Sequence, residues 1–228
     1  MFFFKRKKII LDCFTTVAHA YHIHPITPAT NYYPDWWKNT PRHFLKNGFI
    51  PHSTIKGCSG LIDYYKQGFI IPLWTDIIVD IKDKHYQWQC ADHETKIDVH
   101  PFKEFDQYIS DQDYGHMKIC SPWLLKCKED INWLSIKPYW NFQPIENYSV
   151  STGILNFKYQ KSTHIQLLIS LKENTQILLN ANIPLMHLIP ITEKKIILKT
   201  HLISHDEYLK LNITQSHFVN NYKKQYNI

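Results

Sequence analysis

The chain has 228 residues, of which 44% are hydrophobic and 20% are charged, and its formal net charge is +6. This apolar fraction is enough to build a core, which excludes a mainly disordered chain, a collagen and a coiled coil. No run of about 18 consecutive apolar residues occurs, so the sequence predicts no membrane-spanning helix. The length suits one large domain or two small ones.

Lysine supplies nearly all of the positive charge, and Arg6 and Arg42 are the only arginines. Glycine is scarce, with 6 residues, whereas Tyr, Phe and Trp number 14, 12 and 7. AT-rich codons produce this combination, so we interpret the lysine excess as genomic before functional. The basic run at Lys5, Arg6, Lys7 and Lys8 predicts at most weak contact with nucleic acid, because lysine is a point charge without the guanidinium fork.

The five cysteines are odd in number and form no Cys-x-x-Cys motif. A disulfide framework and a zinc ribbon both need a different pattern, so we expect free thiols in a reducing compartment. Three aromatic residues precede the basic run at the N-terminus, and no cleavage site of small residues follows it. This order predicts that the chain has no signal peptide.

The first elements along the chain are predicted as strands. Residues 9–16 are rich in β-formers, and residues 18–23 form a second candidate that Pro25 and Pro28 close. In the next segment, a short helix is expected between Pro34 and Pro41.

Adjacent tryptophans occupy this short helix. Trp36 and Trp37 cannot share one helix face. We therefore expect one indole to enter the core and the other to cover a groove or a neighbouring loop.

A helix followed by a hairpin is predicted next. Residues 57–68 begin and end with glycine, which indicates a helix of two turns capped by Gly68. Residues 69–81 give the strongest strand signal, and Pro72 inside them implies an edge position or a bulge. A turn at Asp83 and Lys84 would pair this strand with residues 86–91.

The second half of the chain reads as a series of strands. Residues 92–115 form a polar excursion, in which we expect one short helix. Strands are predicted at 117–120, 123–128, 131–137, 148–159 (with a bulge or close approach at Gly153), 164–171, 175–179, 185–191 and 195–203. Ser204, followed by Asp206 and Glu207, predicts the start of a C-terminal helix.

Short strands at this spacing favour a mainly β, single-domain fold, either a β-sandwich or a jelly-roll-like barrel with short helices. We divide it into a basic lead-in at 1–8, a β-rich domain at 9–203 and a C-terminal helical appendage at 204–228. No phosphate-binding glycine loop or nucleophile elbow occurs in the sequence.

Three histidines suggest an alternative, a metal-binding enzyme of the cupin or oxygenase type. His22 and His24 would share one face of a predicted strand, and His187 could supply a third ligand for iron or zinc. The surrounding residues fit neither motif, because the cupin glutamate and the His-x-Asp pair are both missing. Hydrogen-bonded structural histidines are the simpler interpretation.

Aromatic loops are the stronger functional clue. The candidate binding residues are Tyr32, Tyr33, Trp36, Trp37, Tyr139, Trp140 and Phe142. They lie in proline-bounded, non-periodic segments, where aromatic side chains can line a groove or a protein interface. The competing interpretation is that they fill the open ends of a sandwich.

Several segments in order carry a resemblance: Pro-Asp-Trp-Trp-Lys, Cys-Ser-Gly-Leu-Ile-Asp-Tyr-Tyr-Lys-Gln-Gly-Phe-Ile-Ile-Pro-Leu-Trp-Thr-Asp, Ser-Pro-Trp-Leu-Leu-Lys, Ser-Thr-Gly-Ile-Leu-Asn-Phe and Pro-Leu-Met-His-Leu-Ile-Pro-Ile. Over residues 4–209 the chain resembles a family of proteins of marine tailed phages of the large myovirus type, with more distant bacterial members and no assigned activity. The resemblance implies a phage origin and a single β-rich domain, and it carries over no catalytic residue.

Together these observations predict a non-enzymatic accessory or virion-associated phage protein that binds a protein partner of the virion or the host. We expect it in the host bacterial cytoplasm or the virion. No cofactor is expected, and iron or zinc belongs only to the alternative.

Overall fold

The computed structural model describes residues 8–48, 50–101, 104, 113–141 and 147–216. The chain is mainly β and sandwich-like, as predicted, and none of the sheets in these residues closes into a barrel. The predicted lead-in at 1–8 lies almost wholly outside the described residues, as does the end of the predicted C-terminal appendage.

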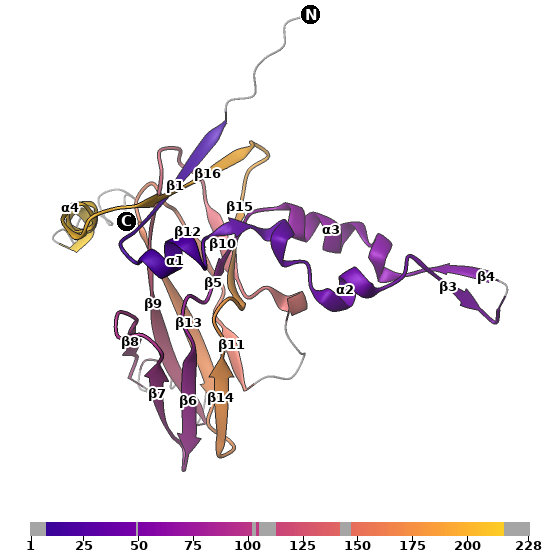
Figure 1. Ribbon diagram of the computed structural model, residues 1–228, viewed down its shortest axis with the longest axis horizontal. Helices are drawn as coiled ribbons and strands as arrows, with labels where there is room; N and C mark the ends of the chain where they lie inside the picture. The colour runs from indigo at the N-terminus through magenta and orange to yellow at the C-terminus, as the bar shows by residue number, and fades with distance from the viewer. Residues whose placement is uncertain (1–7, 49, 102–103, 105–112, 142–146, 217–228) are drawn as a thin grey trace, which may run out of the picture.

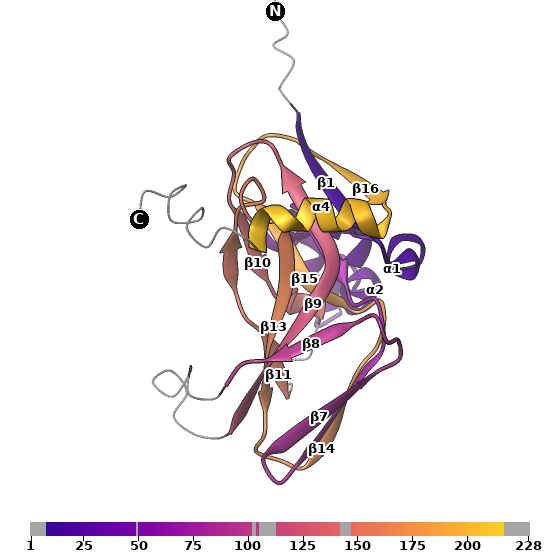
Figure 2. The same cartoon turned by 90° about the vertical axis from the view of Figure 1, so that its left-hand side faces the viewer.

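Two larger sheets form the sandwich (Figures 1 and 2). The first runs β11 (Tyr148–Val150), β13 (Ser162–Ser170), β9 (Tyr114–Cys127), β1 (Ile9–Thr15) and β16 (Ile196–Leu202), and β8 (Lys96–Val99) also pairs with β9. The second runs β12 (Gly153–Leu155), β10 (Trp133–Ile136), β15 (Pro184–Pro190), β5 (Phe69–Pro72) and β2 (Thr27–Pro28). Strand β1 pairs in parallel with β16, so the two ends of the domain lie side by side.

A third sheet extends the sandwich with β14 (Thr175–Leu179), β6 (Ile77–Lys82) and β7 (His85–Cys90). The predicted turn between β6 and β7 is confirmed. Asp83 and Lys84 both have positive φ, at 51° and 63°, as the two central residues of a tight hairpin turn require.

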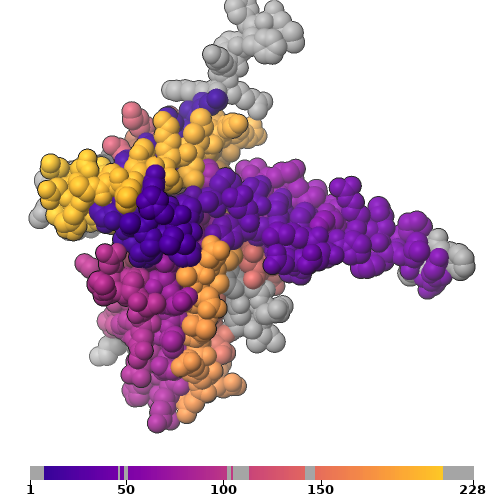
Figure 3. Space-filling model, viewed as in Figure 1, coloured from indigo at the N-terminus to yellow at the C-terminus, as the bar shows by residue number. Residues whose placement is uncertain are grey.

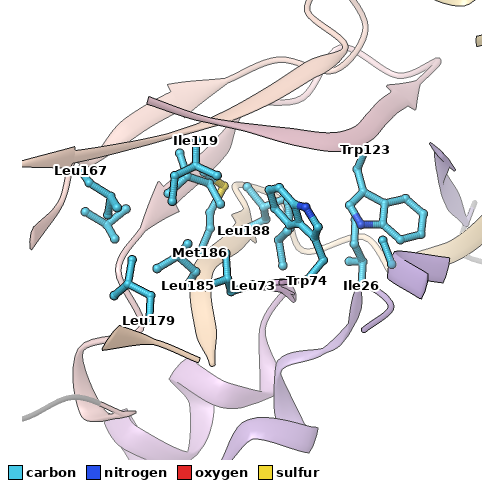
Figure 4. Packing of buried hydrophobic residues seen from close by; sticks show 14 of the residues in the cluster. Ile26, Leu73, Trp74, Ile119, Trp123, Leu167, Leu179, Leu185, Met186 and Leu188 are labelled. Atoms are coloured by element: carbon cyan, nitrogen blue, oxygen red, sulfur yellow. The ribbon is translucent and has the colours of Figure 1, made fainter. Parts of the chain in front are cut away.

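The core lies between the sheets. Figure 4 shows Ile119, Trp123 and Leu167 of the first sheet facing Leu185 and Leu188 of the second. Alternation along the strands explains this layer, because every second residue of β13 is buried and its neighbours are not. Trp123 is fully buried, and such large side chains supply much of the burial that stabilises the layer.

Prolines sit where the strand ladders are irregular. Pro72 ends β5 and pairs with Pro184, beside a register shift between Pro184 and Met186, so the irregularity lies on β15 and not inside a strand over 69–81. Strand β9 is one long strand and not the two predicted, and it passes through Pro122 where its register with β13 shifts. A proline has no N–H to donate, so an irregular ladder accommodates it at little cost.

Three predicted strands are wrong. Residues 69–81 do not form one strand, since β5 pairs with β15 and β2 in the second sheet, whereas β6 pairs with β14 and β7 in the third. Residues 18–22 form helix α1 (Ala18–His22), because the chain has left the first sheet and Tyr21 and Ile23 instead donate to the carbonyls of Val17 and His19. Residues 148–159 do not form one strand, since β11 pairs in the first sheet and β12 in the second. Gly153 has no neighbour within 4 Å of a built Cβ, so no close approach explains it.

The excursion at 92–115 also differs from its prediction in part. Its described portion contains β8, which pairs with β9, while residues 102–103 and 105–112 lie outside the description. At the far end of the domain, helix α4 (His205–Ser216) crosses a face of the first sheet (Figure 2). Ser204 and Glu207 cap it reciprocally, at 2.9 and 3.3 Å from backbone N–H to side-chain oxygen, as predicted.

An arm projects from the sandwich (Figures 1 and 3). We define the arm as residues 29–68, which connect the paired strands β2 and β5. It contains η1 (Ala29–Tyr32), α2 (Asp35–Asn39), β3 (His43–Lys46), β4 (Ile50–Ser53), η2 (Ile55–Gly57) and α3 (Ser59–Lys66). The arm is therefore an elaborated hairpin connection, closed at its base by the Ala29 N–H donating to Gly68 O at 3.1 Å.

The β3–β4 hairpin forms the tip of the arm and was not predicted from the sequence. Its turn is Asn47-Gly48, with φ angles of 56° and 77°, and Asn-Gly is the strongest short-range hairpin signal. The two short helices, by contrast, occupy the predicted places after Pro34 and before Gly68. Within the described residues, no helix is long and apolar enough to cross a membrane.

Gly68 offers a test of how the arm joins the sandwich. Its φ is +72°, and a Cβ there would lie 1.9 Å from the carbonyl oxygen of Leu188 in β15. We expect Gly68→Ala to lower the free energy of unfolding by at least about 2 kcal/mol, because both the backbone conformation and the close approach exclude a side chain. Urea denaturation measures this change. Gly153→Ala is the matched control, with an expected change within about 0.5 kcal/mol, and equal effects of the two substitutions would contradict the close approach.

Candidate functional site

The two aromatic loops singled out in the sequence meet at the base of the arm. Trp36 of α2 donates its indole Nε1–H to the carbonyl oxygen of Trp140 at 2.9 Å. Their ring centroids are 6.0 Å apart, and Trp140 belongs to η4 (Tyr139–Asn141), which follows β10. Segments separated by about a hundred positions in the chain thus form one surface, while Phe142 lies outside the described residues.

Hydrogen bonds through Asn141 lock these segments together. The buried Tyr65 of α3 donates its hydroxyl to Asn141 Oδ1. The Asn141 side chain donates from Nδ2 to Tyr32 O at 2.8 Å, and the Tyr32 hydroxyl donates to Asn182 Oδ1 at 3.0 Å. One amide therefore connects helix α3, the start of the arm and the loop after β10.

Stacked rings fill the space around this amide. Tyr33 stacks on Trp37 with centroids 4.5 Å apart and also contacts Tyr65 at 4.8 Å. The Lys56 ammonium lies 4.2 Å from the centre of the Trp37 ring and donates to Trp37 O at 2.8 Å. The expectation for adjacent tryptophans is confirmed, since the Trp37 ring packs against a buried cluster and the exposed Trp36 covers the neighbouring loop.

The tyrosine hydroxyl groups at the base of the arm stay protonated at neutral pH. Burial raises the pKa of both Tyr32 and Tyr64 to about 12. Burial also raises the pKa of Tyr65, with smaller contributions from its two tyrosine neighbours. Because each hydroxyl keeps its proton, these groups donate hydrogen bonds and are poor candidates for general acid–base chemistry.

His187 lies directly beneath the aromatic base. It is fully buried on β15, its ring meets Tyr64 edge-on at 4.6 Å, and its Nε2 lies 2.7 Å from Gln67 O. A carbonyl oxygen accepts only, so this nitrogen carries the proton. Burial lowers the pKa of His187, and the hydrogen bond to Gln67 offsets part of that effect.

The structure contradicts the geometry that the metal-binding alternative requires. His22 ends helix α1 and is exposed, and His24 lies beyond the helix cap at Ile23, so the two histidines do not share a strand face. The backbone N–H of His24 instead donates to His19 O at 3.2 Å. Across the part of the chain that the structure describes, no group of three or more His, Cys, Asp or Glu side chains is arranged to hold a metal ion.

Exposed apolar side chains occur both at the base of the arm and at its tip. Trp36 and Tyr139 are 44% and 64% exposed at the base, and Phe44 and Leu45 are 56% and 66% exposed on β3. Residues adjacent along a strand point to opposite faces, so both faces of the hairpin carry an exposed apolar side chain. Scattered exposed leucines are ordinary, whereas a contiguous apolar patch indicates an interaction surface.

Charge sets the arm apart from the rest of the chain. The sequence from Trp36 to Ile62 contains no Asp or Glu and holds four cationic residues, Lys38, Arg42, Lys46 and Lys56. Lys38 pairs with Asp35 at 2.9 Å, and Lys56 is hydrogen-bonded inside the base. Arg42, at the start of the hairpin, is exposed.

No protein-family model, curated protein or solved structure matches this chain. The description of the site therefore depends on its own geometry. Sequence reasoning selected six of the described residues that meet here, and it missed Tyr64, Tyr65 and Asn141, which hold them together. Tyr64 and Tyr65 were hidden inside a predicted helix, and nothing in a single sequence shows which loop a buried tyrosine will reach.

The Tyr65 hydroxyl can be tested alone. Tyr65→Phe keeps the ring and removes the donor to Asn141, leaving a part-buried amide oxygen without this partner. We expect the free energy of unfolding to fall by about 1–3 kcal/mol, as measured by urea denaturation. Tyr139→Phe is the matched control, since the Tyr139 side chain is largely exposed and should tolerate the change within about 0.5 kcal/mol. A negligible effect at position 65 would show that the amide does not hold the base.

Acid should weaken the fold through His187. Its pKa in the folded chain lies below the ordinary value of 6.5, so protons bind the unfolded chain more tightly. The free energy of unfolding should then decrease as the pH falls through about 6.5. His24, His116 and His164 also have lowered pKa values, chiefly through burial, and act in the same direction.

His187→Gln should therefore remove part of the decrease in stability between pH 7.5 and pH 5.5, as measured by urea midpoints at each pH. His93→Gln, a change at an exposed histidine of the β7–β8 loop, serves as the control. An unchanged pH dependence in His187→Gln would show that this imidazole is not the group being titrated.

Proposed function

We propose that this protein is a non-enzymatic binding protein of a tailed phage, accessory to or part of the virion, and that the arm is its docking surface for a protein partner. The exposed tip of the arm carries the proposal. An isolated two-stranded hairpin is at best marginally stable in water, and β3 and β4 pair only with each other among the described strands. A partner that covers Phe44 and Leu45 would stabilise the hairpin on binding.

The two outer edges of the hairpin support the same function. Each edge strand presents backbone N–H and C=O groups to solvent, and a partner strand can pair with them. Proteins usually protect such edges when they have no use for them. The exposed Pro51 on β4 protects one position, which leaves β3 as the better edge for a partner strand.

The base of the arm favours tight docking. Asn141, Tyr65 and Trp37 hold the arm by hydrogen bonds and stacked rings that exist before any partner arrives. An ordered base fixes where the tip is presented, so binding has to order only the hairpin and costs less conformational entropy than ordering the whole arm would. This rigidity distinguishes the arm from an ordinary surface connection.

Charge and apolar character together define the partner. The acid-free stretch around Arg42 favours a partner with an acidic rim, and the exposed Phe44 and Leu45 favour an apolar groove inside that rim. A nucleic acid would be recognised chiefly by cationic side chains that reach phosphates, and the arm has only one arginine. The arm therefore suits a protein better than a polynucleotide.

The phage assignment is supported by the family resemblance over residues 4–209 and by the AT-rich residue usage. All five cysteines are free, which fits a protein made in a reducing compartment. The alternative, a cupin- or oxygenase-like enzyme that uses His22, His24 and His187, has no grouping of these ligands in its favour.

The tip of the arm is the part to change in a test. In phages that carry Phe44→Ser together with Leu45→Ser, we expect the protein to be lost from purified virions by at least about tenfold, measured by quantitative mass spectrometry. Removing two central apolar contacts from an interface typically costs at least about 2 kcal/mol. Both side chains are exposed, so the purified variant should keep the melting temperature of the parent.

Leu178→Ser is the matched control, because Leu178 is 53% exposed on β14, an element outside the arm. A photo-reactive benzoylphenylalanine at position 44 should cross-link to one protein, and the same group at position 178 should not. Retention of the arm variant at the level of the control, or cross-linking of position 44 to nucleic acid alone, would contradict the proposal.

A further inference from the structure

A second site lies on the opposite side of the domain from the arm. Helix α4 crosses a face of the first sheet (Figure 2). Residues of the helix and of that sheet line a cleft of about 440 Å³, which we call the α4 cleft. Cys120 and Ser121 of β9 and His164 of β13 line it from the sheet, Trp74 lines it from the loop after β5, and Tyr208 and Asn212 line it from the helix. Its size is within the range of pockets that hold small molecules.

The cleft is preformed, because both of its sides are anchored. Helix α4 is capped at Ser204, and two turns later Lys161 donates its ammonium to Leu211 O at 2.7 Å. On the other side, the Trp74 indole donates to Thr95 Oγ1 at 2.8 Å, and Thr95 in turn donates to Asp92 at 2.9 Å. The indole and the helix are therefore held in place without a ligand.

The groups at the floor of the cleft are polar and uncharged. His164 and Cys120 are cross-strand partners in the β9–β13 ladder. Burial raises the pKa of the Cys120 thiol and lowers the pKa of His164, so both are neutral near pH 7. Burial also raises the pKa of Tyr208, and the neighbouring Cys120 adds to the rise.

Charges around the cleft cancel in pairs. Cys120 Sγ lies 3.7 Å from the Asp98 carboxylate, which pairs with Lys118 at 2.7 Å. At the rim, Glu94 and Lys96 are both exposed and opposite in sign. The charges at the rim therefore sum to about zero, which favours an uncharged ligand over an ion. Hydroxyl groups of such a ligand could both donate to and accept from the imidazole of His164 and the amide of Asn212.

We propose that the α4 cleft binds a small uncharged molecule whose hydroxyl groups meet His164 and Asn212 and whose flat apolar face lies against the Tyr208 ring. A monosaccharide and the ribose of a nucleoside share this chemistry. A larger and more open hollow of about 740 Å³ follows the β6–β7 hairpin. Its lining comes mainly from exposed hairpin side chains, so it offers a ligand less desolvation.

Saturation-transfer NMR with the full chain tests the site and separates the two sources. Glucose and mannose form one set of probes, adenosine and uridine form the other, and citrate and magnesium chloride are the charged comparisons, the last observed by thermal shift. We expect saturable binding of one neutral set with a Kd of about 1 mM or tighter, which corresponds to about −4 kcal/mol. No binding by either neutral set, or binding by the charged probes alone, would overturn the proposal.

Two variants of the same helix locate the binding. Asn212→Trp places a large side chain inside the cleft, and Lys210→Trp places the same side chain on the exposed side of α4. Both variants should have the same melting temperature, which shows that both are folded. Asn212→Trp should then bind the neutral probe at least about tenfold more weakly than the parent, and Lys210→Trp should bind it as the parent does. Equal binding by both would place the ligand elsewhere and overturn the proposal. Neither substitution changes the arm, so both variants should still be incorporated into the virion. A negative result here would therefore leave the proposed function of the arm standing.

Discussion

The hydrogen bond from the Tyr65 hydroxyl to Asn141 is the contact on which the arm depends. It joins helix α3 to the loop after β10, and the same amide continues to the carbonyl of Tyr32. It acts together with the Trp36 indole on Trp140 O and the Tyr32 hydroxyl on Asn182, because the strands β2 and β5 at the base of the arm share only two paired positions. Hydrogen bonds between part-buried groups favour one arrangement of the elements they join, because an alternative arrangement leaves a donor or acceptor unpaired. A long connection between two neighbouring strands thereby becomes a rigid projection.

The sandwich supplies the platform for both proposed sites. Its first sheet is completed only when the last strand, β16, pairs in parallel with the first, β1. Helix α4 follows β16 directly and lies on that sheet, so the α4 cleft exists only once the chain ends have met. The arm leaves the second sheet at its edge strand β2 and projects from the body of the sandwich. The fold therefore places the proposed docking surface and the proposed small-molecule cleft apart, so that one would not block the other.

Much of the local structure could be predicted from individual residues. The Asp83-Lys84 turn, the cap at Ser204 and the helix stop before Gly68 each depend on backbone chemistry that a few residue types satisfy best. The Asn47-Gly48 turn is an equally strong local signal for a hairpin. Failures of another kind occurred at residues 18–22 and 148–159, where β-rich composition suggested strands. Whether such a segment pairs depends on the presence of a neighbouring strand, and composition contains no information about neighbours.

The sequence by itself determined that this is a mainly β domain with a substantial core, free cysteines and aromatic loops without helical or strand periodicity. These properties follow from residue type and short-range spacing, which act through local sterics and burial. Only the tertiary structure decided that the loops around Trp36 and Trp140 meet, that His187 is buried beneath them and that His22 lies apart on a helix. Those outcomes depend on contacts between residues about a hundred positions apart, which are set by how the whole chain packs and leave no trace in any single segment.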